Sequence, residues 1–140
     1  MLNIGLLGAG RIGQVHAVNI AGNAGSRLAA VSDVYAPAAE ALAGTYGAEV
    51  RSSDEIIGDA SIDAVLIATS TDTHSDLIEA ATSAGKAVLC EKPVDLSLER
   101  ARACQKVANA NGQPVMIGFN RRFDPSFAAL KDAFDAGEVP

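Results

Sequence analysis

The chain has 140 residues, of which 49% are hydrophobic and 20% are charged, and its formal net charge is -6. This length suits one domain with a core of its own, and the composition excludes a disordered chain. The negative charge, with no basic cluster larger than the pair Arg121 and Arg122, argues against a nucleic-acid partner.

Six short apolar runs alternate with amphipathic, alanine-rich stretches. The runs span residues 2–8, 27–33, 48–51, 62–68, 86–90 and 114–118, and the third is weak. Helices are predicted between them over 11–22, 37–46, 53–57, 73–84 and 98–111. Because most runs are apolar throughout, they are typical of strands covered on both faces. The pattern predicts an α/β fold, a doubly wound parallel sheet of the Rossmann type with about six strands and helices on both faces.

Local signals mark the ends of the predicted helices. Two helix starts match the Ser/Thr-x-x-Glu/Asp capping pattern, a third carries a serine at the N-cap, and three helices are followed by glycine. These residues are Ser52 with Glu55, Thr73 with Asp76, Ser97, and the glycines Gly47, Gly85 and Gly112.

The sheet accounts for residues 1–120, which we interpret as one dinucleotide-binding domain. Residues 121–140 are surplus to it. In this segment Pro125 opens a helix in which Phe127, Leu130 and Phe134 recur at helical spacing. The segment is therefore either a C-terminal helix that packs on the sheet or the start of a substrate domain.

A glycine-rich loop joins the first strand to the first helix. It has the spacing G-x-G-x-x-G and consists of Gly8, Ala9, Gly10, Arg11, Ile12 and Gly13. Gly8 allows a tight turn, Gly10 lets a pyrophosphate approach the backbone, and Gly13 lets the helix pack closely on the strand. The spacing alone is weak, but its place between a strand and a helix indicates a dinucleotide site at the helix N-terminus.

Asp33 ends the second strand, 20 residues after Gly13. A carboxylate there can accept hydrogen bonds from both hydroxyl groups of an adenosine ribose, and it would repel the 2′-phosphate of NADP. No arginine lies in the following stretch SDVYAP, so NAD is favoured over NADP. The alternative is that Asp33 only caps a helix or forms a turn.

The loops after the later strands meet at the same edge of a parallel sheet, where ligands bind. After the fourth strand, Thr69, Ser70, Thr71 and His74 are predicted to line the groove beside the cofactor. Alternatively, residues 71–73 cap a helix and His74 packs in its first turn, and both descriptions can hold together.

The fifth strand ends in an acid, a base and a proline, the segment E-K-P at 91–93. Lys92 would emerge at the mouth of the crevice, where it can hydrogen-bond the substrate oxygen that loses its proton. Glu91 would hold Lys92 or touch the cofactor ribose, and the alternative is a surface salt bridge. After the sixth strand, Asn120 and one of Arg121 and Arg122 are predicted to reach this edge.

Cysteine usage and the chain start indicate an intracellular protein. Cys90 and Cys104 form neither a CxxC pair nor a metal-binding pattern, and Cys104 is predicted to be a small buried side chain. No apolar run approaches the roughly 20 residues that span a bilayer, so no membrane partner is expected. The N-terminus lacks signal-peptide features, so we expect a cytoplasmic location.

Together these stretches resemble the N-terminal domain of the Gfo/Idh/MocA oxidoreductase family over essentially the whole chain. The matching segments are GLLGAGRIGQVHA, SDVYAP, ATSTDTH, GKAVLCEKP and GFNRRFDP, and E-K-P is the most specific part. The last two look most like bacterial inositol 2-dehydrogenases. The resemblance implies NAD as cofactor, a polyol or sugar as substrate, Lys92 as the active-site lysine, and Glu91 and Lys92 beside the nicotinamide. It also implies a cis bond before Pro93.

Members of this family continue into an α+β domain that carries an Asp-x-x-x-His pair, whose histidine accepts the proton. The histidines of this chain, His16 and His74, lie in no such pair. We therefore expect a truncated dinucleotide-binding domain that binds NAD and does not oxidise inositol alone. One alternative is a non-catalytic nucleotide-binding module that self-associates, giving a homo-oligomer. Another is a methyltransferase that uses S-adenosylmethionine, against which E-K-P and the glycine spacing count.

Overall fold

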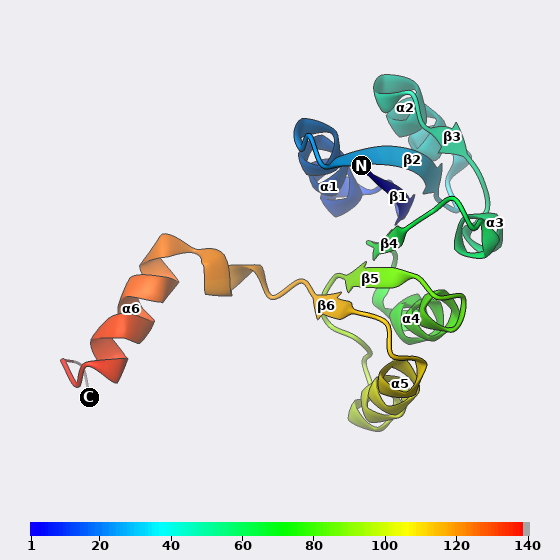
Figure 1. The fold of residues 1–140 in the computed structure, drawn as a ribbon. Coiled ribbons are helices and arrows are strands. Elements are labelled where there is room, and N and C mark those ends of the chain that lie inside the picture. Colours follow the sequence, from blue (N-terminus) through cyan, green and yellow to red (C-terminus); the bar gives the residue numbers. More distant parts are fainter. Residues whose placement is uncertain (139–140) are drawn as a thin grey trace.

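The computed structural model describes residues 1–138, in which strands and helices alternate along the chain (Figure 1). The strands are β1 Leu2–Leu7, β2 Ser26–Ser32, β3 Glu49–Val50, β4 Ala64–Ile67, β5 Ala87–Cys90 and β6 Val115–Ile117. The helices are α1 Arg11–Gly22, α2 Ala36–Tyr46, α3 Ser53–Gly58, α4 His74–Ser83, α5 Leu98–Asn111 and α6 Pro125–Asp135. Short 3₁₀ turns lie at Thr71–Thr73 and Asn120–Phe123.

All six strands form one parallel sheet in the order β3-β2-β1-β4-β5-β6. The predicted doubly wound fold is therefore confirmed. The strand order reverses at β1, where Leu6 lies between Val31 of β2 and Leu66 of β4. Because every strand runs the same way, the loops that follow β1, β4 and β5 emerge at one edge, beside the reversal point.

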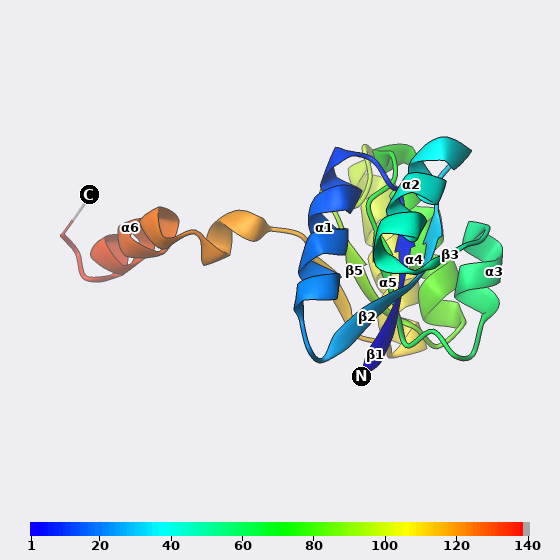
Figure 2. The ribbon, with the colours of Figure 1, turned by 90° about the horizontal axis from the view of Figure 1, so that it is seen from above.

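The sheet is covered on both faces, as the uniformly apolar runs predicted. Leu6 and Leu7 are both 0% exposed and point to opposite faces. Leu6 packs with Ala17 of α1 and Leu42 of α2, whereas the core around Leu7 contains side chains of α3, α4 and α5. Figure 2 shows helices on the two sides of the strands. Burying each large aliphatic side chain in these two layers contributes roughly 1.5–3 kcal/mol.

Most of the predicted helix ends are confirmed. Ser52 and Glu55 form a reciprocal capping box at the start of α3, and Ser97 accepts a hydrogen bond from the backbone N–H of Arg100 at the start of α5. The glycines after α2, α4 and α5 all have positive φ. These local contacts fix where the chain leaves each helix and turns back toward the sheet.

Thr73 is the N-cap residue of α4, as the pattern predicted, but its side chain forms no capping hydrogen bond. Its hydroxyl oxygen lies 2.7 Å from the Thr69 hydroxyl oxygen and donates to the Ser70 carbonyl at 2.8 Å. Thr73 also has helical backbone angles, because the 3₁₀ turn Thr71–Thr73 runs directly into α4. With these partners, the Thr73 hydroxyl does not accept a hydrogen bond from the free N–H groups at the start of α4.

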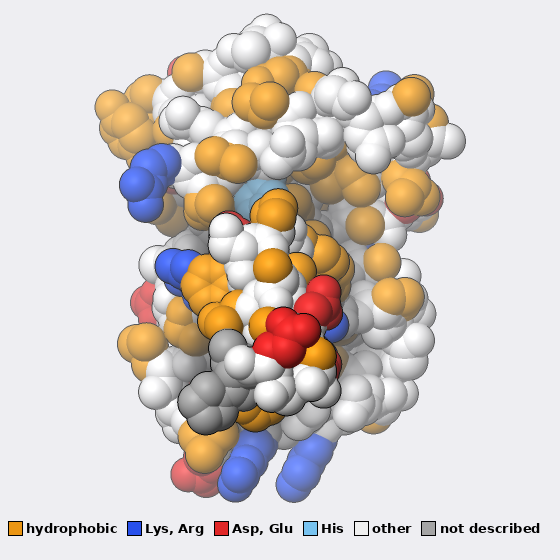
Figure 3. Space-filling model, turned by 90° about the vertical axis from the view of Figure 1, so that its left-hand side faces the viewer, with side chains coloured by type: hydrophobic (Ala, Val, Ile, Leu, Met, Phe, Trp, Pro, Cys, Tyr) orange, Lys and Arg blue, Asp and Glu red, His pale blue; other side chains and the backbone are white. Residues whose placement is uncertain are grey.

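The last helix stands away from the sheet (Figures 1 and 2). No residue of α6 is buried, and Phe127, Leu130 and Phe134 are exposed. Figure 3 views the molecule from the side on which α6 projects, and hydrophobic side chains are visible on the surface of that side. The prediction that this helix packs on the sheet is wrong, whereas its assignment to the start of a further domain stays a prediction. Residues 139–140 of the predicted segment lie outside the described residues.

Both cysteines lie in the layer between the sheet and α4 and α5. Cys104 is buried, as predicted from its helical spacing, and Cys90 is buried at the end of β5. Burial raises the pKa of the Cys90 thiol to about 12. In the described part of the chain, every helix is too short or too polar to cross a bilayer.

One carboxylate, near the edge of the sheet where β4 begins, makes the stability of the protein depend on pH. Asp59 follows α3, accepts a hydrogen bond from the Ser61 N–H at 2.7 Å and forms an ion pair with Arg51. These contacts, the Ser61 N–H first, lower the pKa of Asp59 to about 2. Because the folded pKa lies below the unfolded one, the stabilisation is complete above about pH 4 and is lost as the pH falls towards 2.

We therefore expect the melting temperature of the wild-type chain to fall more steeply between pH 4 and pH 2 than that of Asp59→Asn. Thermal unfolding followed by circular dichroism at half-unit pH intervals would measure this difference. Asp132→Asn, on the exposed helix α6, is the matched control and should follow the wild-type curve. Parallel curves for the wild type and Asp59→Asn would contradict the assignment.

Candidate functional site

The glycine loop after β1 is held in close contact with its surroundings. Gly8 has φ +99, and a Cβ there would lie 2.4 Å from the Ala68 carbonyl oxygen at the end of β4. A Cβ at Gly13 would lie 2.0 Å from the Gly8 carbonyl oxygen. Both distances are below any real contact, so these two glycines are required for the loop, the end of β4 and α1 to approach one another.

Gly10, by contrast, faces open space. A Cβ at this position would meet no protein atom within 4 Å, although Gly10 is the N-cap of α1. Among residues 1–138, no side chain caps this helix start, and its first turn carries no acidic residue. Ala9 is buried beneath the loop, while Arg11 and Ile12 are exposed beside it. The loop thus has the open backbone and the uncapped helix start that a pyrophosphate requires.

Asp33 connects the end of β2 to the glycine loop. One of its carboxylate oxygens accepts a hydrogen bond from the Ala9 N–H at 2.6 Å, and the other accepts from the Tyr35 N–H at 2.8 Å. The turn function, which was the alternative for this residue, is therefore present. Each carboxylate oxygen has capacity for a second hydrogen bond, so the contacts also leave acceptors for ribose hydroxyl groups.

The loop after β4 adjoins the glycine loop. The backbone nitrogen of Thr69 would lie 2.8 Å from a Cβ at Gly8, which places the start of this loop directly beside the turn. The Thr69 hydroxyl pairs with that of Thr73, so its side chain is turned into its own loop. Ser70 is exposed and Thr71 is partly buried. Of the predicted cofactor residues in this loop, Ser70 is the most accessible.

His74 lies beneath this loop, with 1% of its surface exposed. Its Nδ1 is 2.8 Å from the Pro93 carbonyl oxygen, and its Nε2 is 3.1 Å from the Thr69 carbonyl oxygen. Both ring nitrogens therefore face backbone groups of the protein. The alternative in which His74 packs in the first turn of the helix is confirmed, and its ring has no free nitrogen for a ligand in the groove.

The E-K-P segment follows β5, and the Lys92–Pro93 bond is cis, as the family resemblance implied. Lys92 is exposed, and among residues 1–138 its ammonium group forms no ion pair. Glu91 pairs instead with His16, whose Nε2 lies 2.8 Å from its Oε1. The surface salt bridge, which was the alternative for this segment, does not form between Glu91 and Lys92 within residues 1–138, and the lysine side chain stays exposed.

His16 is the site residue that the sequence reasoning missed. It lies on α1, one helical turn after Gly13, so a helical projection places it on the side of α1 that approaches the sheet. The spacing of three residues between Gly13 and His16 is the sequence signal that could have indicated that His16 faces the sheet. Its partner is 75 residues away in the sequence, and only the strand order brings the two side chains together.

The loop after β6 begins at this edge, beside Glu91, and then leads away from the sheet to α6 (Figure 1). Gly118 N–H donates to the Cys90 carbonyl at 2.8 Å, which keeps the end of β6 beside β5. Asn120 is exposed at the start of a 3₁₀ turn. Arg121 and Arg122 lie over the rings of Phe127 and Phe123, at 4.9 and 5.7 Å from the ring centroids. Both guanidinium groups therefore pack within the segment that leads to α6.

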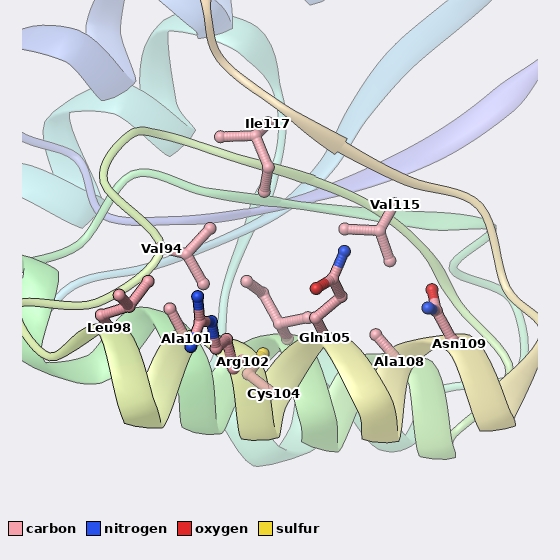
Figure 4. Close-up of a pocket in the computed structure, with 11 residues that line it drawn as sticks. Val94, Leu98, Ala101, Arg102, Cys104, Gln105, Ala108, Asn109, Val115 and Ile117 are labelled. Atoms are coloured by element: carbon pink, nitrogen blue, oxygen red, sulfur yellow. The ribbon is translucent and has the colours of Figure 1, made fainter.

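An apolar groove of about 420 Å³ lies elsewhere, between α5 and β6 (Figure 4). Its walls include Leu98 and Ala101 of α5 and Val115 and Ile117 of β6. None of the predicted site residues lines it. The candidate cofactor site is thus the open edge around the glycine loop and not this groove.

Comparison with known proteins agrees with this geometry. The family described as "Oxidoreductase family, NAD-binding Rossmann fold" matches residues 2–119. The inositol 2-dehydrogenase of Rhizobium meliloti is 57% identical over 99% of this chain and 42% of its own length. The scyllo-inositol 2-dehydrogenase (NAD(+)) of Bacillus subtilis is 42% identical over 96% of this chain and 40% of its own length.

A solved structure also shows similarity to an inositol dehydrogenase. The scyllo-inositol dehydrogenase of Lactobacillus casei, solved with bound NAD(H) and scyllo-inositol, is 34% identical and superposes with a TM-score of 0.92. The superposition covers 99% of this chain and 42% of that protein. The chain thus spans about two fifths of the length of these relatives. It belongs to the Gfo/Idh/MocA oxidoreductase family, of which it is the NAD-binding Rossmann domain.

Proposed function

We propose that this domain serves an inositol 2-dehydrogenase-like enzyme, which oxidises a secondary alcohol of a cyclic polyol and reduces NAD. The observation that carries the proposal is the position of Lys92. Its neighbour Glu91 is bonded to His16 on the helix that starts at the glycine loop, so the lysine emerges beside the cofactor edge. The relatives named above, which are inositol dehydrogenases, support the substrate class.

The residues that would hold NAD lie around the glycine loop. Gly8 to Gly13 would contact the pyrophosphate through the backbone, and Asp33 would accept hydrogen bonds from the ribose hydroxyl groups. Thr69, Ser70, Thr71, Glu91 and Asn120 stay predicted contacts at the same edge. When bound, NAD supplies a nicotinamide ring that accepts a hydride.

Lys92 provides the charge that the reaction needs. Its ammonium group is exposed and without a carboxylate partner among the described residues, so it can donate a hydrogen bond to the alcohol oxygen. That contact stabilises the negative charge that develops on the oxygen as its proton leaves. His16 and His74 are both engaged with other groups of the domain. The main proton acceptor is therefore expected on a further domain of the full enzyme.

Location and assembly stay predictions. An enzyme that uses the cellular NAD pool would act in the cytoplasm. Self-association through the apolar side of α6 is the expected route to a homo-oligomer, because Phe127, Leu130 and Phe134 are exposed there.

The first test concerns the glycine loop. Gly10→Ala should leave the melting temperature nearly unchanged, because the added methyl group meets no protein atom, but it should weaken NAD binding about tenfold or more. Gly13→Ala should instead destabilise the fold by roughly 1–3 kcal/mol, because its methyl group would overlap the Gly8 carbonyl. Titration calorimetry with NAD and urea unfolding would separate the two effects. Unchanged NAD affinity in a folded Gly10→Ala variant would contradict the site.

The second test concerns the choice between NAD and NADP. Asp33→Asn should weaken NAD binding roughly tenfold and strengthen NADP binding, because a charged acceptor for the ribose hydroxyls and the repulsion of the 2′-phosphate are both lost. Calorimetric titrations of each nucleotide measure the ratio of the two Kd values. Asp54→Asn, an exposed aspartate on α3, should leave the ratio at its wild-type value. If the ratio of the two Kd values in Asp33→Asn is the same as in the wild type, this role for Asp33 is excluded.

The third test concerns the reaction. This chain should replace the matching segment of the Rhizobium meliloti inositol 2-dehydrogenase and yield a chimera that forms NADH from myo-inositol. In that chimera Lys92→Ala should lower kcat roughly 100-fold or more without changing NAD affinity. A chimera that folds and binds NAD but forms no NADH with inositol would disprove the proposed substrate class. Full activity of Lys92→Ala would disprove the role of the lysine.

A further inference from the structure

We propose that His16 and His74 are positioning residues that anchor the chain on both sides of Lys92 and so fix the direction in which the lysine leaves the sheet. Both imidazole rings are held by groups of the E-K-P segment, one through Glu91 and the other through Pro93. The inference rests on the proposed function only in taking Lys92 as the catalytic group.

The first anchor is the bond between His16 and Glu91. The two side chains are 19% and 17% exposed, and the Nε2 to Oε1 distance is 2.8 Å. The second oxygen of Glu91 accepts a hydrogen bond from the Lys92 N–H at 3.3 Å. A Cβ at Gly118 would lie 3.2 Å from this carboxylate, so the end of β6 closes the other side. His16 thus holds a carboxylate that in turn binds the backbone of Lys92.

The second anchor is the ring of His74. It connects the Pro93 carbonyl, one residue after Lys92, to the Thr69 carbonyl in the loop after β4. A neutral imidazole has one N–H and can donate to only one of these carbonyls at a time, whereas an imidazolium donates to both. The next residue of α4, Ser75, adds bonds to the Val94 carbonyl at 3.2 Å and the Asp95 carboxylate at 2.7 Å. The first turn of α4 therefore binds the chain beyond Lys92.

The two anchors come from opposite layers of the domain. His16 belongs to α1, which packs on one face of the sheet, and His74 belongs to α4, which packs on the other. Lys92 lies between the two anchored residues and is itself exposed. Its backbone is thereby fixed relative to both helix layers, while its side chain stays free. Both nitrogens of His74 face backbone carbonyls, and His16 is hydrogen-bonded to Glu91, so each histidine acts on Lys92 through a neighbouring residue.

The test compares His16→Leu, which loses the hydrogen bond to Glu91, with His16→Gln, whose amide can restore it. Asn19→Leu makes the same polar-to-leucine change on the exposed side of α1 and is the matched control. Hydrogen exchange measured by NMR on the 140-residue chain should show the Lys92 amide exchanging about fivefold faster in His16→Leu. Exchange should be close to the wild-type rate in His16→Gln and Asn19→Leu. An unchanged rate in a folded His16→Leu variant would overturn the proposal.

A second readout follows the lysine side chain. With ¹³C-labelled lysine, the Cε signal of Lys92 should shift when NAD is added to the wild type, and Lys131 on α6 is the internal reference. At saturating NAD, His16→Leu should lose at least half of this shift and His16→Gln should regain it. A merely structural role would lower the melting temperature but leave the saturated shift at its full size, which would overturn the proposal.

The same measurements separate the two hypotheses. If the wild-type Lys92 signal does not respond to NAD, the proposed function fails at this residue, while the exchange rates still decide the positioning role. His74→Phe should accelerate exchange at Lys92 in the same way, because it removes the bond to Pro93 and keeps the ring volume. Because that variant removes the buried polar contacts of the His74 ring with two carbonyl groups, it can fail to fold, and the partly exposed His16 supplies the decisive pair of variants.

Discussion

The close approach of α1 to the loop after β1 is the constraint on which the rest of the site depends. With no side chain at Gly13, the helix backbone lies directly against the Gly8 carbonyl. This contact sets where α1 begins and how it crosses the sheet. It places the uncapped helix start at the carboxyl edge, and one turn later it brings His16 to Glu91. The absence of a side chain at Gly13 thus allows both the exposed backbone at the start of α1 and the hydrogen bond between His16 and Glu91.

The parallel direction of the strands brings the residues of the site together at one edge of the sheet. The loops after β1, β4 and β5 emerge at one edge, and each is tied to its neighbour by a specific contact. Gly8 lies against Ala68 at the end of β4. The ring of His74 lies between the carbonyl groups of Thr69 and Pro93. His16 on α1 is hydrogen-bonded to Glu91. Residues from distant parts of the chain are therefore connected at this edge by direct contacts. There, the side chains predicted to act on ligands, such as Lys92, stay exposed.

Much of the fold could be predicted from sequence because its signals are local. Uniformly apolar runs located the strands, and the capping box at Ser52 located a helix start. The missing capping bond of Thr73 could not be predicted, since its hydroxyl has a competing partner in Thr69 that only the folded loop supplies. The partners of His74 are backbone carbonyls, which leave no trace in the residue pattern. The position of α6 also escaped prediction, because helical spacing shows an apolar side but not what covers it.

The burial of both thiols has a consequence for how this domain can be studied. Cys90 and Cys104 lie inside the same layer, and burial raises the pKa of both thiols. Because the thiolate is the reactive form, the folded chain should be inert to thiol reagents at neutral pH. Modification then requires the layer between β5 and α5 to open. The two cysteines are therefore natural reporters of local unfolding beneath the E-K-P segment, and they need no engineered label.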